Sequence, residues 1–253
     1  MSFESLLKGI AQKDIVLPYL ELAMMSDKWP DHYTVDIDSS PYYGLTETGE
    51  PDGYFHPSTH PLCPPRQLYY MMHPEHRSQM VRERNTTTSA MTLSMGSALH
   101  GIVQTQLQMI GLLVPEKTEV EYILHEHHVR GKIDFILDLP DGEKNLVGEM
   151  KTQNSFGFKK QEKVKPEWDA QLSLAEYSQN ADHGVLILVE AGWPYSLREF
   201  AHKRNDNLLD EIFDKFSLVR QAIESNEPPR HCCAEGSEEM QACQARYSCW
   251  LKP

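Results

Sequence analysis

Two acidic residues and a lysine near the middle of the chain have the types and the spacing of a hydrolytic site. The segment GKIDFILDLPDGEKNLVGEMKT contains Asp141-Gly142, the strongest short-range signal for a two-residue turn between two apolar strands. With that turn, Asp134 and Glu149 face each other on neighbouring strands, with Cβ atoms about 5 Å apart. Lys151 follows Glu149 by two residues and therefore points to the same side of the strand.

Two like charges that face each other destabilise a sheet unless a cation lies between them. Carboxylate oxygens prefer hard divalent cations, so the pair indicates a metal site. The alternative is a surface hairpin with two solvated acids, because an error of one residue in the turn moves Asp134 to the other face. The neighbouring residues favour the metal, since they are typical of strands buried in a sheet: Ile133, Phe135, Ile136, Leu146 and Val147.

The pattern G-x-x-D ending at Asp134, followed by E-x-K at Glu149 and Lys151, resembles the PD-(D/E)XK nuclease core in its RecB-like branch. Upstream, the segment GSALH ending at His100 is similar to the helix motif of that branch. Downstream, Gln171 in DAQLSLAEY is similar to its characteristic glutamine. Each residue by itself has an ordinary structural explanation, but their order and separations together favour the nuclease motif.

The resemblance implies a restriction-endonuclease-like α/β core, with a mixed central sheet flanked by helices. The implied catalytic residues are Asp134, Glu149, Lys151 and Gln171, and the implied ligands of Mn²⁺ or Mg²⁺ are His100, Asp134, Glu149 and the backbone carbonyl of Met150. A histidine ligand favours Mn²⁺. Such an ion polarises the scissile phosphate, while Lys151 orients the attacking water and balances developing charge. Glu119 and Glu121 precede the hairpin and are candidate accessory acids, although a solvated face is the favoured interpretation.

Cysteines form the second group of residues with a chemical pattern. Cys63 stands alone, whereas Cys232, Cys233, Cys243 and Cys249 crowd into the last segment of the sequence. In reducing surroundings, such a group indicates metal or iron–sulfur ligation before it indicates disulfides.

The cysteine pattern resembles the iron–sulfur subset of RecB-like nucleases, which includes the AddB nuclease domain and the RecB-like nuclease of CRISPR adaptation systems. The resemblance implies a [4Fe–4S] cluster held by Cys63, Cys233, Cys243 and Cys249, with Cys232 as the alternative to Cys233. Nine residues separate Cys233 from Cys243 where the subset usually has two, and we interpret the excess as an insertion. A structural Zn²⁺ bound by four thiolates, or by three and His231, is the second interpretation, and free thiols are the third.

The net charge of −13 argues against a polybasic partner surface. Residues 1–56 hold ten acids and three bases, so this segment carries more than half of the excess and is expected to face away from DNA or to meet a protein partner. Residues 57–118 and 156–170 are net positive and flank the motif. They supply the candidate DNA contacts Arg66, Tyr70, Lys159 and Lys160, because cations track phosphates and aromatic rings stack on bases.

Helices and strands around the hairpin must position these residues. Helix patterns occupy Ser2–Met25, Pro65–Arg84, Ser89–Gly111, Glu167–Gln179 and the region between Leu197 and Ser225; strand patterns occupy Val120–His125, His128–Leu139, Asn145–Lys151 and Gly184–Glu190. This order predicts an α/β core with a mixed sheet. Three parts are expected: an acidic N-terminal helical or irregular extension (1–56), the nuclease core (57–230), and a cysteine-rich tail (231–253). The tail closes a cluster with Cys63, in an iron–sulfur stapled subdomain that joins the N-terminal and C-terminal segments.

Together the motifs predict a metal-dependent DNA exonuclease that acts on single strands or duplex ends, in recombination, repair or CRISPR-type adaptation. The alternatives are an endonuclease of the same fold and a non-catalytic interaction module stapled by zinc. No apolar run reaches the length of about 20 residues that spans a bilayer, and the first residues do not resemble a secretory signal. The expected location is therefore cytoplasmic, in the host cytoplasm if the chain comes from a phage. Cleavage polarity, DNA or RNA preference and the oligomeric state, an oligomer included, are left open.

Overall fold

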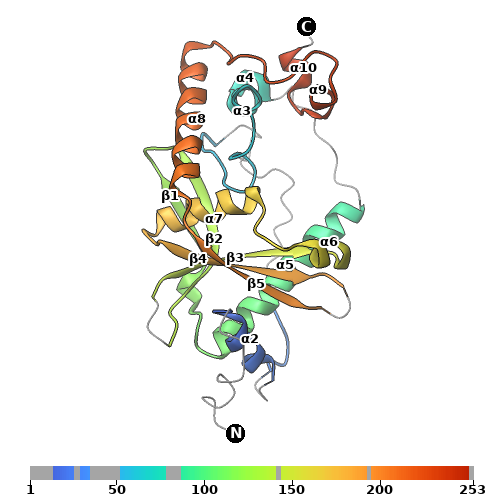
Figure 1. Ribbon diagram of the computed structural model, residues 1–253, viewed down its shortest axis with the longest axis vertical. Helices are drawn as coiled ribbons and strands as arrows, with labels where there is room; N and C mark the ends of the chain where they lie inside the picture. The colour runs from blue at the N-terminus through green and yellow to red at the C-terminus, as the bar shows by residue number, and fades with distance from the viewer. Residues whose placement is uncertain are drawn as a thin grey trace. The chain divides into compact units, whose positions relative to one another are not determined.

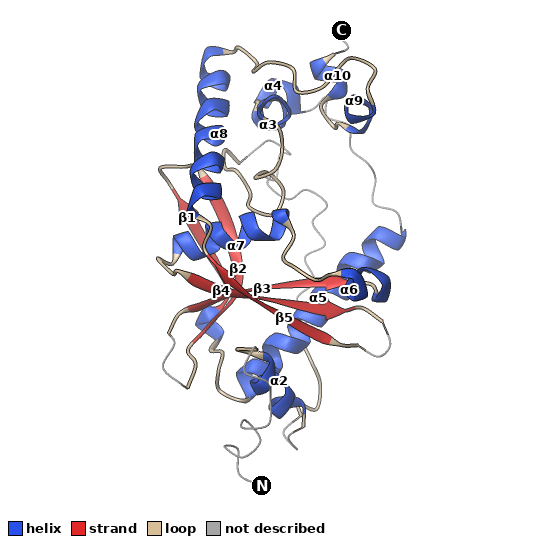
Figure 2. Ribbon diagram, in the orientation of Figure 1, coloured by secondary structure: helices blue, strands red, loops and turns tan. Residues whose placement is uncertain are grey.

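The computed structural model describes residues 14–25, 29–34, 52–77, 87–140, 144–192 and 195–250 (Figures 1 and 2). The helices are α2 (Leu17–Met24), α3 (Pro65–Met72), α4 (Pro74–Arg77), α5 (Thr87–Met109), α6 (Ser155–Lys160), α7 (Pro166–Ser178), α8 (Asp206–Ser225), α9 (Glu238–Ala242) and α10 (Arg246–Cys249), with a 3-10 turn at Pro115–Lys117. The strands are β1 (Thr118–Leu124), β2 (Val129–Leu137), β3 (Leu146–Gln153), β4 (His183–Glu190) and β5 (Leu197–Lys203). Within these ranges no helix is long and apolar enough to cross a membrane.

The chain folds into two compact units, each built from three separated segments. The first contains Met1–Ser39, Thr87–Tyr122 and Lys132–Arg204, and the second contains Ser40–Thr86, Ile123–Gly131 and Asn205–Pro253. The expected boundaries at residues 56 and 230 are sequential, whereas these units interleave along the chain. Every predicted catalytic residue belongs to the first unit, and every cysteine belongs to the second.

One five-stranded sheet has the order β1-β2-β3-β4-β5. Strands β2 and β3 are antiparallel, β3 and β4 are parallel, and β4 and β5 are antiparallel, which confirms the predicted mixed sheet. Phe135 of β2 faces Gly148 of β3, the register that a turn at Asp141-Gly142 predicts, although the turn itself lies outside the described residues. A Cβ atom on Gly148 would lie 1.8 Å from the Phe135 ring, so the ring leaves room for glycine only.

The hydrophobic core of the first unit lies between the sheet and the helices α2 and α5 (Figure 2). Phe135, Met150 and Ile187 from the sheet meet Leu20 from α2 and Leu107 from α5, and all five side chains are fully buried. Helix α7 packs against β3, β4 and β5 on the other face of the sheet. Because side chains alternate along a strand, the residues on either side of Met150 point toward α7.

The long helix predicted between Leu197 and Ser225 is confirmed as α8, but its predicted first residues form strand β5 instead. The buried positions in the strand include Glu199 and His202, so the strand lacks the apolar alternation that identifies a strand in sequence. The Glu199 carboxylate accepts hydrogen bonds from the backbone at the start of α2: from Ile15 N at 2.5 Å, Val16 N at 2.8 Å and Leu17 N at 2.8 Å. A side chain from a distant strand therefore caps this helix, whose own N-cap residue makes no side-chain cap.

The helix predicted from Pro65 to Arg84 is divided at His73, whose backbone is extended (φ −74°, ψ 122°). Proline at position 74 explains the break, because proline disfavours the helical conformation in the residue before it. Residues 78–86 lie outside the described part of the chain, as do residues 2–13 of the predicted first helix. The short helix α6, which the sequence patterns do not predict, is capped by Asn154, whose side chain accepts a hydrogen bond of 2.8 Å from Gly157 N.

Candidate active site

The two predicted acids lie side by side on β2 and β3 with little exposure to solvent. The side chain of Asp134 is 14% exposed and that of Glu149 is 3% exposed. Asp134 Oδ2 accepts a hydrogen bond of 2.6 Å from Met150 N, which ties the carboxylate to strand β3 next to Glu149. The bond satisfies one oxygen of Asp134 with a backbone donor and fixes its direction.

A closed network joins Glu149 to the lysine and the glutamine. Lys151 Nζ donates to Glu149 Oε1 at 2.6 Å and to Gln171 Oε1 at 2.8 Å, while Gln171 Nε2 donates to Glu149 Oε1 at 2.7 Å. Gln171 comes from α7, on the face of the sheet that Glu149 and Lys151 share. An amide suits this position because its oxygen accepts from the ammonium and its nitrogen donates to the carboxylate, whereas a second carboxylate would repel Glu149.

Burial raises the pKa of both acids, and the charge of Asp134 adds to the effect at Glu149. Burial and the charge of Asp134 raise the pKa of Glu149 to about 8, although the contact with Lys151 acts in the opposite direction. Burial also raises the pKa of Asp134, against the charges of His100 and Lys151. Two neighbouring carboxyl groups that resist ionisation are typical of functional sites, because a bound cation would stabilise their charged forms.

Glu119 lies close to this site, but its side chain is 38% exposed and pairs with Lys132 Nζ at 2.9 Å, so its role as an accessory acid stays a prediction. Its charge raises the pKa of both Asp134 and Glu149. Gln104 Nε2 donates to Glu119 Oε1 at 2.8 Å and to the Asp134 carbonyl oxygen at 2.9 Å, so one amide connects the two residues. Glu119 has a φ of 53°, an uncommon conformation for a residue other than glycine. Gln104 follows His100 by four residues on the same helix, and this spacing is the sequence signal that could have placed Gln104 in the site.

The donors of the site suit a hard divalent cation in kind but are not gathered around one point. His100 Nδ1 lies 3.8 Å from Asp134 Oδ2, and Glu149 Oε2 is buried without a hydrogen-bond partner. Carboxylate oxygens with one imidazole fit Mg²⁺ or Mn²⁺. Within the described ranges, however, no group of three or more His, Cys, Asp or Glu side chains is arranged to hold a metal ion. Met150 pairs with Ile187 in the sheet, and the role of its carbonyl as a ligand stays a prediction.

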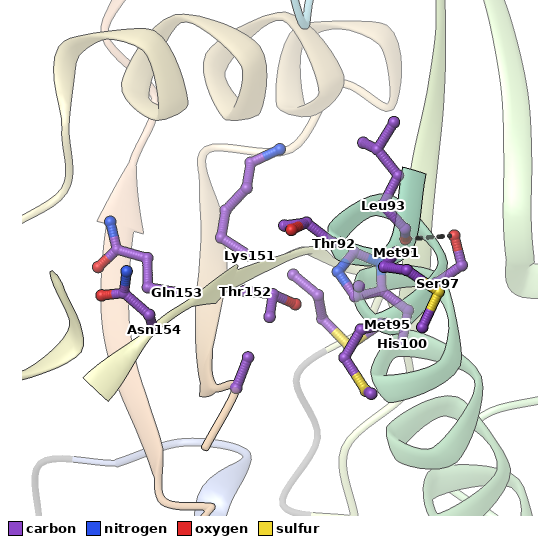
Figure 3. A pocket seen from close by; sticks show the side chains of 13 residues that line it. Met91, Thr92, Leu93, Met95, Ser97, His100, Lys151, Thr152, Gln153 and Asn154 are labelled. Carbon is purple, nitrogen blue, oxygen red and sulfur yellow. Dashed lines mark hydrogen bonds between the residues drawn. The ribbon is translucent and has the colours of Figure 1, made fainter. Parts of the chain in front are cut away.

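A cavity of about 830 Å³ lies beside these residues, between α5 and the end of β3 (Figure 3). Its volume falls within the range of small-molecule sites. The α5 wall includes Met91, Leu93 and Met95, which are 63%, 60% and 47% exposed. Three predicted site residues, His100, Met150 and Lys151, line the cavity as well, and Figure 3 shows side chains of both elements around it.

The predicted DNA contacts divide into exposed and buried pairs. Lys159 and Lys160 are exposed in the last turn of α6, and Lys160 Nζ lies 3.9 Å from the centre of the Phe156 ring, which is itself 69% exposed. A cation beside an exposed ring is an arrangement that suits single strands.

Arg66 and Tyr70, in contrast, are 9% and 5% exposed. Arg66 Nε donates to Cys249 Sγ at 2.9 Å, and its guanidinium also donates to the Tyr70 hydroxyl at 3.3 Å and to the Pro229 carbonyl. The guanidinium of Arg66 therefore donates its hydrogen bonds to partners within the second unit. The burial argues against direct contact of either side chain with DNA.

The five cysteines form no disulfide with one another. Burial raises the pKa of Cys63, and the charge of Cys243 adds to the effect. Burial also raises the pKa of Cys243, to which the charges of Cys249 and Cys233 contribute. For Cys232, burial raises the pKa most and the charge of Cys233 comes second. The predicted cluster ligands therefore share one neighbourhood, although no formed metal site is present among them in the part of the chain that is described.

The fold and the site define a class: a mixed α/β protein whose central sheet carries two buried acids and a lysine, with a glutamine from the covering helix. No protein-family model matches the chain, and no curated protein matches it.

Solved structures show limited likeness. An alkaline exonuclease from Laribacter hongkongensis (LHK-Exo) is 16% identical, with a TM-score of 0.48, and covers 69% of this chain and 89% of its own. Its complex with dAMP gives a TM-score of 0.47 at the same identity and coverage. The protein SSO0001 is 16% identical over 98% of this chain and 95% of its own, with a TM-score of 0.40. At TM-scores below 0.5 these likenesses support no conclusion about the function of this chain.

Proposed function

We propose that the chain is a metal-dependent nuclease that hydrolyses phosphodiester bonds of DNA, as an exonuclease on single strands or duplex ends. The observation that supports this most directly is the network of Glu149, Lys151 and Gln171 beside the buried Asp134. Structural ion pairs also bury charge, but here Glu149 lies beside a second buried acid, Asp134, and its Oε2 stays without a hydrogen-bond partner. Burial and the charge of Asp134 favour a proton on Glu149, and a catalytic cation would take the place of that proton.

Each residue has a role that follows from its contacts. Lys151, held in place by Glu149 and Gln171, would stabilise the negative charge that develops on the phosphate. Mn²⁺ or Mg²⁺, held by Asp134, Glu149 and His100, would supply the charge that polarises the phosphate and makes water more acidic. Because the pKa of Glu149 is about 8, the cation must displace its proton, so metal affinity should fall as the pH falls.

The cavity beside the site and the lysines of α6 together form the proposed binding surface for a DNA strand. Apolar side chains accept bases of any type, and the exposed Lys159 and Lys160 neutralise phosphates. The sequence contains no motif for reading base edges, so the proposed cutting is tolerant of sequence.

The function is tested with labelled linear DNA of each strand polarity, in Mn²⁺ or Mg²⁺ and in a chelator. Asp134→Asn should lower the rate at least about a hundredfold, because the variant loses the ionised carboxylate. Asp138→Asn is the matched control, since Asp138 is 41% exposed and pairs with Lys117 at 2.8 Å instead; its rate should stay within about twofold. Digestion by Asp134→Asn as fast as by the parent, or digestion unaffected by chelator, would contradict the proposal.

Circular single-stranded DNA separates the two modes of cutting. An exonuclease leaves the circle intact while it digests the same sequence as a linear strand. Cleavage of the circle at a similar rate would instead favour the endonuclease. Parallel RNA substrates decide the nucleic acid preference.

For the second unit we propose a [4Fe–4S] cluster held by Cys63, Cys233, Cys243 and Cys249. The proposal is supported by the sequence pattern, by the charge of Cys243 acting on Cys63, and by the charges of Cys233 and Cys249 acting on Cys243. Anaerobically purified protein should contain iron and show the broad visible absorbance of iron–sulfur thiolates. Colourless protein with zinc and without iron would favour structural Zn²⁺, and, if it also lacked nuclease activity, the non-catalytic module.

A further inference from the structure

A buried histidine on β5 bridges two carboxylates of α7. His202 Nδ1 lies 2.8 Å from Glu176 Oε1, and His202 Nε2 lies 2.9 Å from Asp169 Oδ1. The side chain of His202 is 6% exposed and that of Glu176 is fully buried, whereas Asp169 is 28% exposed. Burial of a charged group is costly unless the charge is paired, so these three ionisable groups depend on one another for their partners.

The bridge needs a proton on each ring nitrogen when both carboxylates are ionised. Burial lowers the pKa of His202, but the hydrogen bonds and charges of Glu176 and Asp169 raise it by more. Burial raises the pKa of Glu176, against the contact with His202 and the charges of Arg204 and His183. The raised pKa values of His202 and Glu176 favour protonated forms of both groups. A protonated His202 can donate to Glu176 and to Asp169 at the same time.

The two carboxylates hold α7 at two points along its length. Asp169 and Glu176 are seven residues apart, which is about two turns and about 10 Å along the helix axis. A helix bonded at two such points on one side resists both sliding along its axis and rotation about it. The partner, His202, belongs to β5, whose backbone is paired to β4 from His183 to Val189.

Gln171 lies between these two points on the helix and points to the opposite side. Two residues after Asp169 correspond to a rotation of about 200° around the axis. A rotation of α7 by about 20°, at a radius of about 5–6 Å, would move the amide of Gln171 by about 2 Å. That displacement is enough to lose the bonds of 2.7 and 2.8 Å to Glu149 and Lys151.

We propose that His202 is a positioning residue for the active site: by bridging Asp169 and Glu176 it fixes the rotation of α7 and so keeps Gln171 on Glu149 and Lys151. The inference rests on the proposed nuclease function for its catalytic consequence. Its structural consequence, the fixed position of the Gln171 amide, does not depend on that function.

The test compares His202→Phe with Lys203→Gln, an exposed neighbour on the same strand. In His202→Phe, kcat should fall about tenfold to a hundredfold with KM changed by less than about twofold, because the substrate contacts are intact while the catalytic amide is misplaced. Lys203→Gln should match the parent. Asp169→Asn, which retains an oxygen in place of the carboxylate, should keep more activity than Asp169→Ala.

A second measurement uses no catalysis. The side-chain amide signals of Gln171 in ¹H–¹⁵N spectra should shift in His202→Phe and exchange with solvent about tenfold faster or more, because the amide loses its two partners. If His202→Phe does not fold, Asp169→Ala, at a partly exposed position, takes its place and should show the same change to a smaller degree. Unchanged Gln171 signals in a folded variant would overturn the inference. Absence of nuclease activity in the parent would overturn only the proposed function.

Discussion

Gly148 is the residue at which a single methyl group tests the geometry beside the active site. An added Cβ would lie 1.8, 2.1 and 2.4 Å from three atoms of the Phe135 ring, far inside any real contact distance. Phe135 is fully buried in the core, so its ring has no open space to move into. Overpacking of this kind costs about 1–3 kcal/mol, and the upper end applies where the neighbour is fixed. We therefore expect Gly148→Ala to lower the free energy of unfolding by about 3 kcal/mol.

The cost should depend on the ring, which makes a double-mutant cycle decisive. In a Phe135→Leu background the clash is relieved, so Gly148→Ala should cost at least about 1 kcal/mol less than in the parent. Gly96→Ala is the matched control, because a Cβ there meets only Thr152 Oγ1, at 3.9 Å. Urea denaturation, followed by circular dichroism, measures every variant. An unchanged midpoint for Gly148→Ala, or a cost that Phe135→Leu does not reduce, would refute the reasoning.

Three further predictions concern the cap, the histidine cluster and the lysines. Glu199→Ala should destabilise the fold by about 2–4 kcal/mol in urea denaturation, because three backbone N–H groups at the start of α2 lose their acceptor; a change below about 1 kcal/mol would contradict the capping role. The raised pKa of His202 means that its contribution to stability is complete below its unfolded value of about 6.5 and declines as the pH rises through the folded value. The difference in unfolding free energy between the parent and His202→Phe should therefore shrink from about pH 6 to about pH 9, and a difference independent of pH would disagree. Replacing Lys159 and Lys160 with glutamine should weaken binding of single-stranded DNA and lower the slope of log affinity against log salt by roughly 0.7 for each phosphate that is no longer neutralised, as measured by fluorescence anisotropy; an unchanged slope would place DNA elsewhere.

The sequence was informative wherever a local rule decides the structure. The two-residue turn at Asp141-Gly142 predicts the register in which Phe135 faces Gly148, and a spacing of two puts Lys151 on the side of Glu149. The helix with Gln171 and the mixed sheet follow from periodicity and order. Strand β5 does not, because its buried positions include Glu199 and His202, and acids and histidines in a strand are not distinguishable from surface residues by pattern.

What the sequence by itself determined was the set of residues that belong on one hairpin and the order of the elements around it. Only the tertiary structure decided the contacts of these residues: Gln104 bonds to Glu119, and Gln171 bonds to Glu149. It also decided that Arg66 of the second unit is buried. These outcomes depend on contacts between residues far apart in the chain. Burial of a polar side chain is costly unless hydrogen-bond partners are available, so those contacts determine which side chain is buried and which stays exposed. Local propensity and spacing contain no information about either effect.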